Sequence, residues 1–331
     1  MQHTIQHLYK THGDDGLLYA WFLSMHTRVD IILCCQKSEN ELMLVVNSIY
    51  DTLRQLERIA NYYDPSSELS QVNQRASTAP VMISQSLYRM ISLCTEYHKK
   101  TLGCFDVTIH SDNYNQDTIH SIHLYPEAQS VFFQQAGTTI NLSGFLKGYA
   151  LDKIREILKV HIIANALINM GNSSVLALGN HPVGTGWKVS FDDQASTTKN
   201  HKTQSILLNN ECLTTSGNNS DDRKHIISPS SGKPLEGVRQ VTVVTDDGTT
   251  GEILSTSLFV ANQKQRELIM SEFLPKRVID FGTVPDGLGN GVFTGKGTPK
   301  SGIPSASHPI FCNRGLRLSD SPVLPLGTLL A

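Results

Sequence analysis

The sequence contains no apolar run approaching the roughly 18 residues that a membrane-spanning helix needs. Its first ten residues lack the apolar core of a secretory signal peptide. The six cysteines form no CxxC pair and no cysteine–histidine cluster at zinc spacing, so free buried thiols are expected. A net charge of −2 gives no electrostatic reason to expect nucleic-acid or membrane binding. We expect a cytoplasmic protein, or a periplasmic one if a leader was removed.

What the sequence does contain is the composition of an ordinary globular protein. Hydrophobic residues make up 39% of the 331 residues and charged residues 18%. This length suits one large or two modest domains. We expect a polar N-terminal extension over residues 1–17, one folded domain over 18–295, and an extended Pro/Ser/Gly-rich tail over 296–331.

Apolar periodicity predicts both helices and strands along the chain. Two clearly amphipathic helices are predicted over residues 41–61 and 83–101, and shorter ones over 251–260 and 263–274. Runs rich in β-branched residues predict strands within 18–35, 164–179, 187–191, 238–245 and 277–282.

The stretch from Thr138 to Leu158 reads as a strand, a glycine turn and an amphipathic helix. The strand is predicted over Thr138–Leu142, the turn at Ser143 and Gly144, and the helix from Lys147 onward. The free N–H groups at such a helix start favour a phosphate, and Lys147 would add a positive charge. The alternative is an ordinary strand-to-helix connection whose lysine faces solvent.

Two further positions carry groups suited to catalysis. Glu252 and Thr256 are four residues apart and share one helix face, which would suit a hard cation that takes oxygen ligands. The alternative is that Glu252 lies in the first helical turn and complements the helix dipole.

His225 begins a short strand that leads into a proline–glycine loop. The chain holds thirteen histidines, so a lone one is more often structural than catalytic.

Six separated strings, in order and at plausible spacing, resemble the ApbE family, the FAD:protein FMN transferases. The resemblance covers about residues 18–295. The strings lie at Met25–Thr27, Tyr62–Asn73, Gly103–Ile109, Asn141–Asp152, His225–Pro234 and Gly251–Thr256.

This resemblance implies an α+β fold, with a mixed β-sheet core, flanking helices, a T-fold-like architecture and a central nucleotide cleft. It also implies transfer of FMN from FAD to a threonine or serine hydroxyl of an acceptor protein, with release of AMP. Mg²⁺ or another divalent cation would assist.

The family's functional positions map onto this sequence residue by residue. His225 would be the catalytic base. The residues that would contact FAD are Met25, Tyr63, Cys104, Phe105, Asp106, Asn141, Lys147 and Ile226. The residues that would hold the metal are Gly144, through its carbonyl, together with Glu252, Ser255 and Thr256.

Four positions depart from the family pattern: Asn141, Asn172, Asn218 and Glu252. Asn218 falls in a loop predicted over 213–219, and Asn172 in a turn where asparagine tolerates a left-handed backbone. These departures keep two alternatives open. The chain could hold FAD as a carrier or sensor without efficient transfer, or it could hydrolyse FAD to FMN and AMP.

Overall fold

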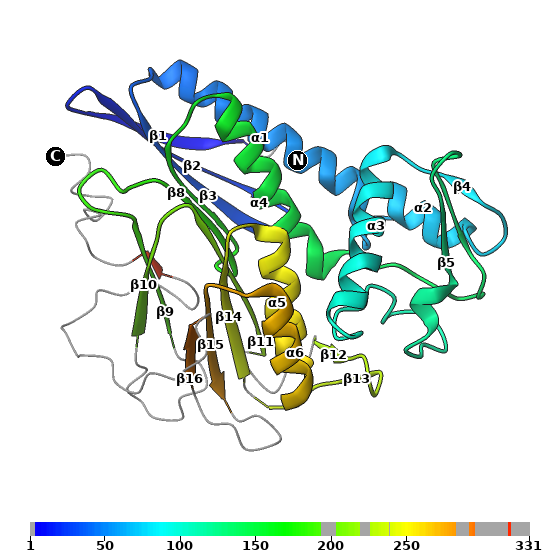
Figure 1. Ribbon diagram of the computed structural model, residues 1–331. Coiled ribbons are helices and arrows are strands. Elements are labelled where there is room, and N and C mark those ends of the chain that lie inside the picture. The colour runs from blue at the N-terminus through cyan, green and yellow to red at the C-terminus, as the bar shows by residue number, and fades with distance from the viewer. Residues whose placement is uncertain are drawn as a thin grey trace.

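The structure, a computed structural model, describes residues 4–192, 203–218, 226–237, 239–282, 291–294 and 317–318. A nine-stranded sheet forms the body of the protein (Figure 1). Its strands, in spatial order, are β1 (Gln6–His12), β2 (Asp15–Ser24), β3 (Thr27–Cys35), β7 (Asn165–Met170), β8 (Ser174–Leu178), β11 (Glu211–Asn218), β14 (Arg239–Thr245), β15 (Arg277–Gly282) and β16 (Gly291–Thr294).

The predicted α+β architecture is confirmed, but the strand directions differ from the expected mixed sheet. All eight neighbouring pairs in this sheet are antiparallel. Short turns join several neighbours directly, and such turns can only connect antiparallel strands. The N-terminal segment also belongs to the sheet, because β1 pairs with β2 along its whole length.

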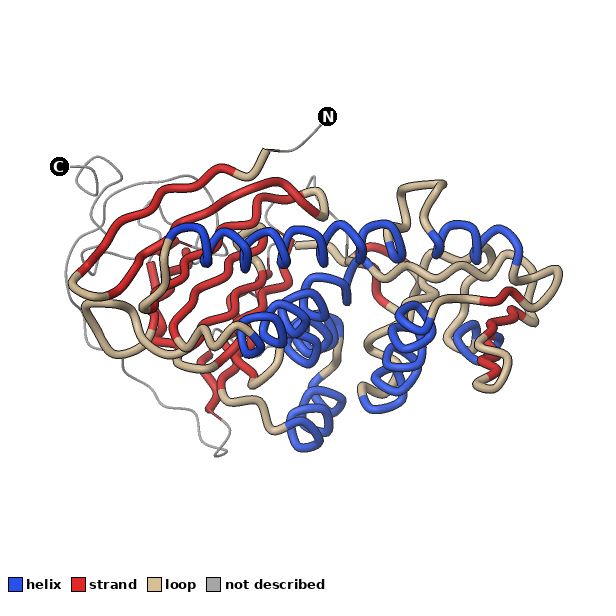
Figure 2. The backbone as a smooth tube through the Cα atoms, turned by 90° about the horizontal axis from the view of Figure 1, so that it is seen from above, coloured by secondary structure: helices blue, strands red, loops and turns tan. Residues whose placement is uncertain are grey.

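Six α-helices are described. They are α1 (Glu39–Ala60), α2 (Glu68–Arg75), α3 (Gln85–Lys100), α4 (Ser143–Val160), α5 (Gly248–Val260) and α6 (Gln263–Phe273). A capping box between Ser38 and Glu41 fixes the start of α1. The buried face of α1 packs with α4 against one face of the sheet, as Figure 2 shows from above. No helix in these described ranges is long and apolar enough to cross a membrane.

Side chains alternate between the two faces of the sheet, so that apolar residues are buried on both. In β7, Ala166 and Ile168 join the core under the helices, whereas Leu167 joins the opposite core. A small sheet of β10 (Thr203–Leu208), β9 (Trp187–Asp192) and β17 (Arg317–Leu318) covers that opposite face. Trp187 is buried there, and its indole N–H donates to the carbonyl of Leu178 at 2.7 Å.

A smaller lobe lies beyond the C-terminal end of α1 (Figures 1 and 2). It contains α2, α3, a 3₁₀ turn at Thr118–Ser121 and a sheet of β4 (Val81–Met82), β6 (Ser130–Phe133) and β5 (Ile122–Tyr125). A separate hairpin of β12 (Ile227–Ser228) and β13 (Lys233–Pro234) follows β11 in the chain. Tyr97 of α3 bonds Thr250 of α5 at 2.9 Å between their hydroxyls, which ties the lobe to the body.

The strand predicted over Thr138–Leu142 is wrong. The backbone N–H groups here bond to side chains and not to a neighbouring strand. The Ile140 N–H donates to Asn73 Oδ1 at 2.8 Å, and the Thr139 N–H donates to Ser111 Oγ at 2.9 Å. The segment therefore does not pair with a strand. The following helix begins at Ser143, four residues before the predicted start.

Two other boundaries differ from the predictions. Helix α5 begins at Gly248 rather than residue 251, because the Asp247 side chain accepts from the Thr250 N–H as its N-cap. The loop predicted over 213–219 is a strand through Asn218, paired with β8 and β14. Residue 219 and most of the predicted tail over 296–331 lie outside the described residues.

The turn between β2 and β3 holds two residues in left-handed conformations. Met25 has φ 51° and His26 has φ 57°, while Ser24 and Thr27 pair across the hairpin. Positive φ at both central positions is the type I′ arrangement, which favours Asn-Gly over bulky residues. Asn172, between β7 and β8, has φ 57° and is held by two hydrogen bonds with the Asn169 side chain.

Substituting His26→Gly should therefore raise the free energy of unfolding by about 1 kcal/mol, because a left-handed backbone costs other residues roughly that amount. Urea unfolding followed by circular dichroism would measure it. Asn172→Gly is the matched control: asparagine tolerates this conformation and glycine would lose the bonds to Asn169, so no gain is expected. A less stable His26→Gly protein would show that contacts of the imidazole outweigh the strain.

Candidate functional site

The centre of the site is the crossing of α4 and α5, where Lys147 meets Glu252. The Lys147 Nζ lies 3.8 Å from Glu252 Oε1 and donates to the Ser173 hydroxyl. Ser174 donates from its hydroxyl to the same Glu252 oxygen at 2.8 Å. Glu252 is only 4% exposed, so this is a nearly buried carboxylate that faces a single ammonium group.

Burial dominates the electrostatics of Glu252. It raises the pKa of the carboxyl group, and the neighbouring Lys147 and Ser174 offset this only in part. The alternative of a first-turn, dipole-complementing glutamate is wrong, because Glu252 is the fifth residue of α5 and is aimed at α4. A second positive charge beside this carboxylate would favour its ionised form.

Hydroxyl groups extend the polar cluster along α5. Ser216 of β11 bonds Ser255 at 2.9 Å and Thr256 at 3.0 Å, in each case between hydroxyl oxygens. Ser255 also donates to the Glu252 carbonyl at 3.1 Å and is fully buried, whereas Thr256 is half-buried. Across the described ranges no three His, Cys, Asp or Glu residues gather as metal ligands. A cation here would depend on one carboxylate with hydroxyl and carbonyl oxygens.

The start of α4 is open to solvent. Ser143 and Gly144 are exposed, and the N-cap residue Leu142 offers no capping side chain. Asn141, from the predicted nucleotide set, accepts the Ser143 N–H on Oδ1 at 2.9 Å. The backbone N–H of Asn141 donates to the Val107 carbonyl at 2.8 Å, which ties α4 to the segment holding the next three predicted residues.

That segment, Cys104–Asp106, is mostly buried. Burial raises the pKa of the Cys104 thiol to about 11, so it is neutral at pH 7. Asp106 accepts from the Thr108 N–H at 2.7 Å and from the Tyr114 hydroxyl at 3.0 Å, so its carboxylate is committed to holding the loop. The ring of Phe105 lies 3.9 Å from the place that a Cβ on Gly144 would occupy.

The turn at Met25 and His26 meets Tyr63 at the C-terminal end of α1. The Met25 N–H donates to Glu57 Oε1 at 2.6 Å, and the ring of His26 stands edge-on to Tyr63 at 6.4 Å between centroids. Tyr63 is 66% exposed, which leaves most of its ring free to meet a ligand. The neighbouring Thr27 packs closely on Gly171. Any side chain at position 171 would overlap the side chain of Thr27.

The predicted base His225 lies outside the described residues, but its neighbour Ile226 does not. Ile226 is buried in the same apolar cluster as Cys104. The Tyr114 hydroxyl also reaches the Pro229 carbonyl, at 3.4 Å, and so joins the loop after Ile226 to Asp106. The chain next to His225 is thus fixed against the Cys104–Asp106 segment.

Three residues that the sequence reasoning missed take part in this arrangement. Ser174 bonds Glu252, Ser216 bonds the hydroxyls of α5, and Asp152 binds the start of α5 from α4. Asp152 was visible in the string Asn141–Asp152 without an assigned role. Serines inside strands carry no distinguishing pattern, so only the fold reveals the other two.

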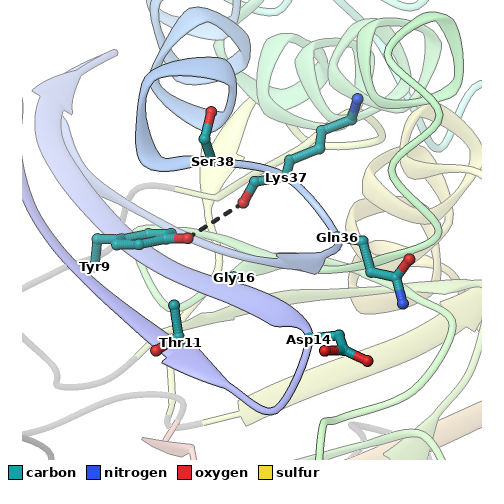
Figure 3. Close-up of a pocket in the computed structure, with 7 residues that line it drawn as sticks. All are labelled: Tyr9, Thr11, Asp14, Gly16, Gln36, Lys37 and Ser38. Atoms are coloured by element: carbon teal, nitrogen blue, oxygen red, sulfur yellow. Dashed lines mark hydrogen bonds between the residues drawn. The ribbon is translucent and has the colours of Figure 1, made fainter.

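A hollow of about 370 Å³ lies elsewhere, lined by Tyr9, Thr11, Asp14, Gly16, Gln36, Lys37 and Ser38 (Figure 3). It sits beside the N-cap of α1, whereas Met25 bonds Glu57 near the other end of that 22-residue helix. A helix of this length spans about 33 Å, so the hollow is remote from the Met25 turn. It contains none of the predicted site residues.

Comparison with known proteins gives a consistent result. A family model described as the ApbE family matches residues 25–276, more than half of the chain. An FAD:protein FMN transferase of Klebsiella pneumoniae (strain 342) is 25% identical over 268 residues, covering 70% of this chain and 82% of the relative. One from Chlamydia muridarum is 24% identical over 256 residues, covering 67% and 77%.

Solved structures show the same fold. The flavin transferase ApbE from Vibrio cholerae superimposes with a TM-score of 0.71 at 18% identity, covering 88% of this chain and 97% of that one. The ApbE protein from Thermotoga maritima gives a TM-score of 0.67 at 19% identity, covering 88% and 97%.

The raised pKa of Glu252 predicts a pH-dependent stability difference. An acid whose folded pKa exceeds its unfolded value destabilises the fold as pH rises from the unfolded pKa, about 4.3, through the folded one. Without divalent cations, Glu252→Gln should therefore melt above the wild type at pH 7, and the difference should vanish toward pH 4. Glu156→Gln, at an exposed position of α4, should match the wild type throughout. A Glu252→Gln protein that melts lower at pH 7 would contradict this.

Proposed function

This chain belongs to the ApbE family, and on that premise we propose that it is an FAD:protein FMN transferase. It would move FMN from FAD to a threonine or serine hydroxyl of an acceptor protein. The observation that supports this most is the partly exposed ammonium of Lys147, which faces the buried Glu252 beside the exposed start of α4. A nucleotide pyrophosphate needs cationic groups and N–H donors. Asn141 and the Leu142 carbonyl already bind the N–H groups of Ser143, Phe145 and Leu146, so the donor at this helix start would be the N–H of Gly144.

The proposed reaction exchanges one P–O bond for another. The acceptor hydroxyl oxygen attacks the phosphorus on the FMN side of the FAD pyrophosphate. The bond from that phosphorus to the bridging oxygen breaks, and the bridging oxygen leaves with its electron pair as part of AMP. His225 would take the hydroxyl proton, since a neutral imidazole can act as a base near pH 7.

The residues around Glu252 fit a divalent cation of the hard, oxygen-binding kind. The buried carboxylate and the hydroxyls of Ser255 and Thr256 are oxygen donors, and the Gly144 carbonyl at the start of α4 would complete the set. Such a cation, Mg²⁺ being the first candidate, would neutralise pyrophosphate charge as the P–O bond breaks. Lys147 would hold a phosphate oxygen from the adjoining turn of α4.

The nucleotide would extend from this centre toward the small lobe. Phe105 lies beside Gly144, and the exposed ring of Tyr63 lies next to the Met25–His26 turn. An exposed aromatic ring can stack on a flavin, and a methionine side chain adapts to such a surface. The buried Asp106 would act by fixing this loop.

Incubating the protein with FAD, MgCl₂ and a threonine-containing acceptor peptide should release AMP and attach FMN to the peptide. Glu252→Gln should lower AMP release to the level seen without divalent cation, while flavin fluorescence still reports FAD binding. AMP without labelled peptide would indicate FAD hydrolysis instead. FAD binding with no AMP from the wild type would indicate a flavin carrier.

His225→Ala should lower transfer by roughly 10²–10⁴-fold, the usual contribution of a general base. FAD affinity and melting temperature should change little, because the base acts on the acceptor hydroxyl. Wild-type transfer should fall below about pH 6.5, where an imidazole becomes protonated. Unchanged turnover in the variant would remove His225 from the mechanism, and joint loss of FAD affinity and stability would make it structural.

A further inference from the structure

The N–H groups in the first turn of α5 donate hydrogen bonds to a carboxylate on another helix. Asp152 of α4 accepts the Gly248 N–H on Oδ1 at 2.7 Å, and on Oδ2 it accepts the Thr249 N–H at 2.9 Å and the Thr249 hydroxyl at 2.5 Å. Asp247, the N-cap, accepts the Thr250 N–H at 2.7 Å. With the Gly251 N–H on the Asp247 carbonyl, all four N–H groups that open the helix are satisfied.

The two helix starts therefore differ in what they can bind. The start of α5 is closed by Asp152, which leaves no donor there for a substrate phosphate. At the start of α4, Ser143 and Gly144 are exposed, and the Ser143 N–H is bonded to the neutral side chain of Asn141. The positive end of the α5 dipole thus attracts a protein carboxylate, which fixes this helix on α4.

The contacts between α4 and α5 are reciprocal. The helices cross at Gly148 and Gly248, whose backbones nearly touch. Asp152 lies four residues after Gly148 and binds the start of α5, while Glu252 lies four residues after Gly248 and packs on Gly148. One helical turn beyond the crossing, each helix thus carries a carboxylate side chain that contacts the other helix.

We propose that Asp152 is a positioning residue for the cation site, a role that rests on the proposed function. By holding the start of α5 against α4, it sets the distance from Glu252 to Lys147 and to the Gly144 carbonyl. These groups lie on different helices, so a small slide of α5 would separate them. Both oxygens of Asp152 bond to the start of α5, so it would act on the site through this helix.

The bonding pattern requires a carboxylate at this position. Three donors converge on two oxygens of Asp152, and an asparagine there would offer one acceptor oxygen and turn an NH₂ group toward an N–H. Asp247 offers a matched control, because it carries the same charge at the same helix start. Asparagine is as good an N-cap as aspartate, so Asp247→Asn should keep its bond.

The test is calorimetric titration of the cation-free proteins with MgCl₂ at 10 °C, well below melting. Asp152→Asn should weaken Mg²⁺ binding by about tenfold, at the low end for outer-sphere partners of metal ligands. Asp247→Asn should stay within about twofold of wild type. Thr249→Val removes only the hydroxyl bond to Asp152, keeps the fold, and should give an intermediate loss. The Mg²⁺-induced rise in melting temperature should follow the same order.

Equal Mg²⁺ affinity in the Asp152→Asn and Asp247→Asn proteins, with Asp152→Asn melting lower, would overturn the proposal and leave Asp152 a purely structural cap. Wild-type affinity in Thr249→Val together with unchanged Asp152→Asn binding would do the same. A wild type that releases AMP from FAD but binds no Mg²⁺ overturns both the cation site and its positioning residue. Mg²⁺ binding in the expected order without any AMP release would contradict only the proposed transferase activity.

Discussion

The close approach of α4 and α5 is the constraint on which the rest of the site depends. A Cβ added at Gly148 would lie 2.6 Å from the carbonyl carbon of Gly248 and 2.8 Å from the Cγ of Glu252. Only glycine allows the two backbones to come this near. Because Lys147 adjoins one glycine and Glu252 follows the other by one turn, the crossing itself brings the charged pair together. The buried carboxylate is therefore a consequence of helix packing.

Helix α5 can hold a buried charge because both of its ends are anchored. At its C-terminal end, Arg239 and Arg266 donate to the carbonyls of Phe259 and Leu258, and both arginines pair with Asp280. Buried ion networks of this kind add little net stability, but removing one member leaves an uncompensated charge. Together with the caps at its start, they leave α5 few alternative positions. Contacts at both ends of α5 thus hold Glu252 in its buried position.

Apolar periodicity predicts α1 and α3 to within two residues at each end, because each presents one buried face to a core. It misjudges Thr138–Leu142, whose apolar, β-branched composition suits a strand while its hydrogen bonds go to Asn73 and Ser111. Periodicity also does not predict that Glu252 is buried. Residues on nearly every side of α5 are apolar or small, so the helix has no polar face from which the exposed and buried sides could be told apart. The resemblance supplies residue types at the site. Their contacts depend on how α4 and α5 cross, which no local pattern encodes.

The departures from the family pattern differ in what they change. Asn172 keeps a left-handed turn, Asn141 still accepts the N–H that opens α4, and Asn218 donates from Nδ2 to the Leu235 carbonyl at 3.0 Å. These three asparagines serve backbone geometry: Asn172 takes a left-handed conformation, Asn141 accepts from a backbone N–H, and Asn218 donates to a backbone carbonyl. Glu252 differs, because it stands where the resemblance to the ApbE family places an aspartate, and its carboxylate, on an arm one methylene longer, meets the Ser174 hydroxyl and the ammonium of Lys147. If chemistry in this chain differs from that of its relatives, the difference should therefore arise at Glu252, where a longer arm shifts a buried charge.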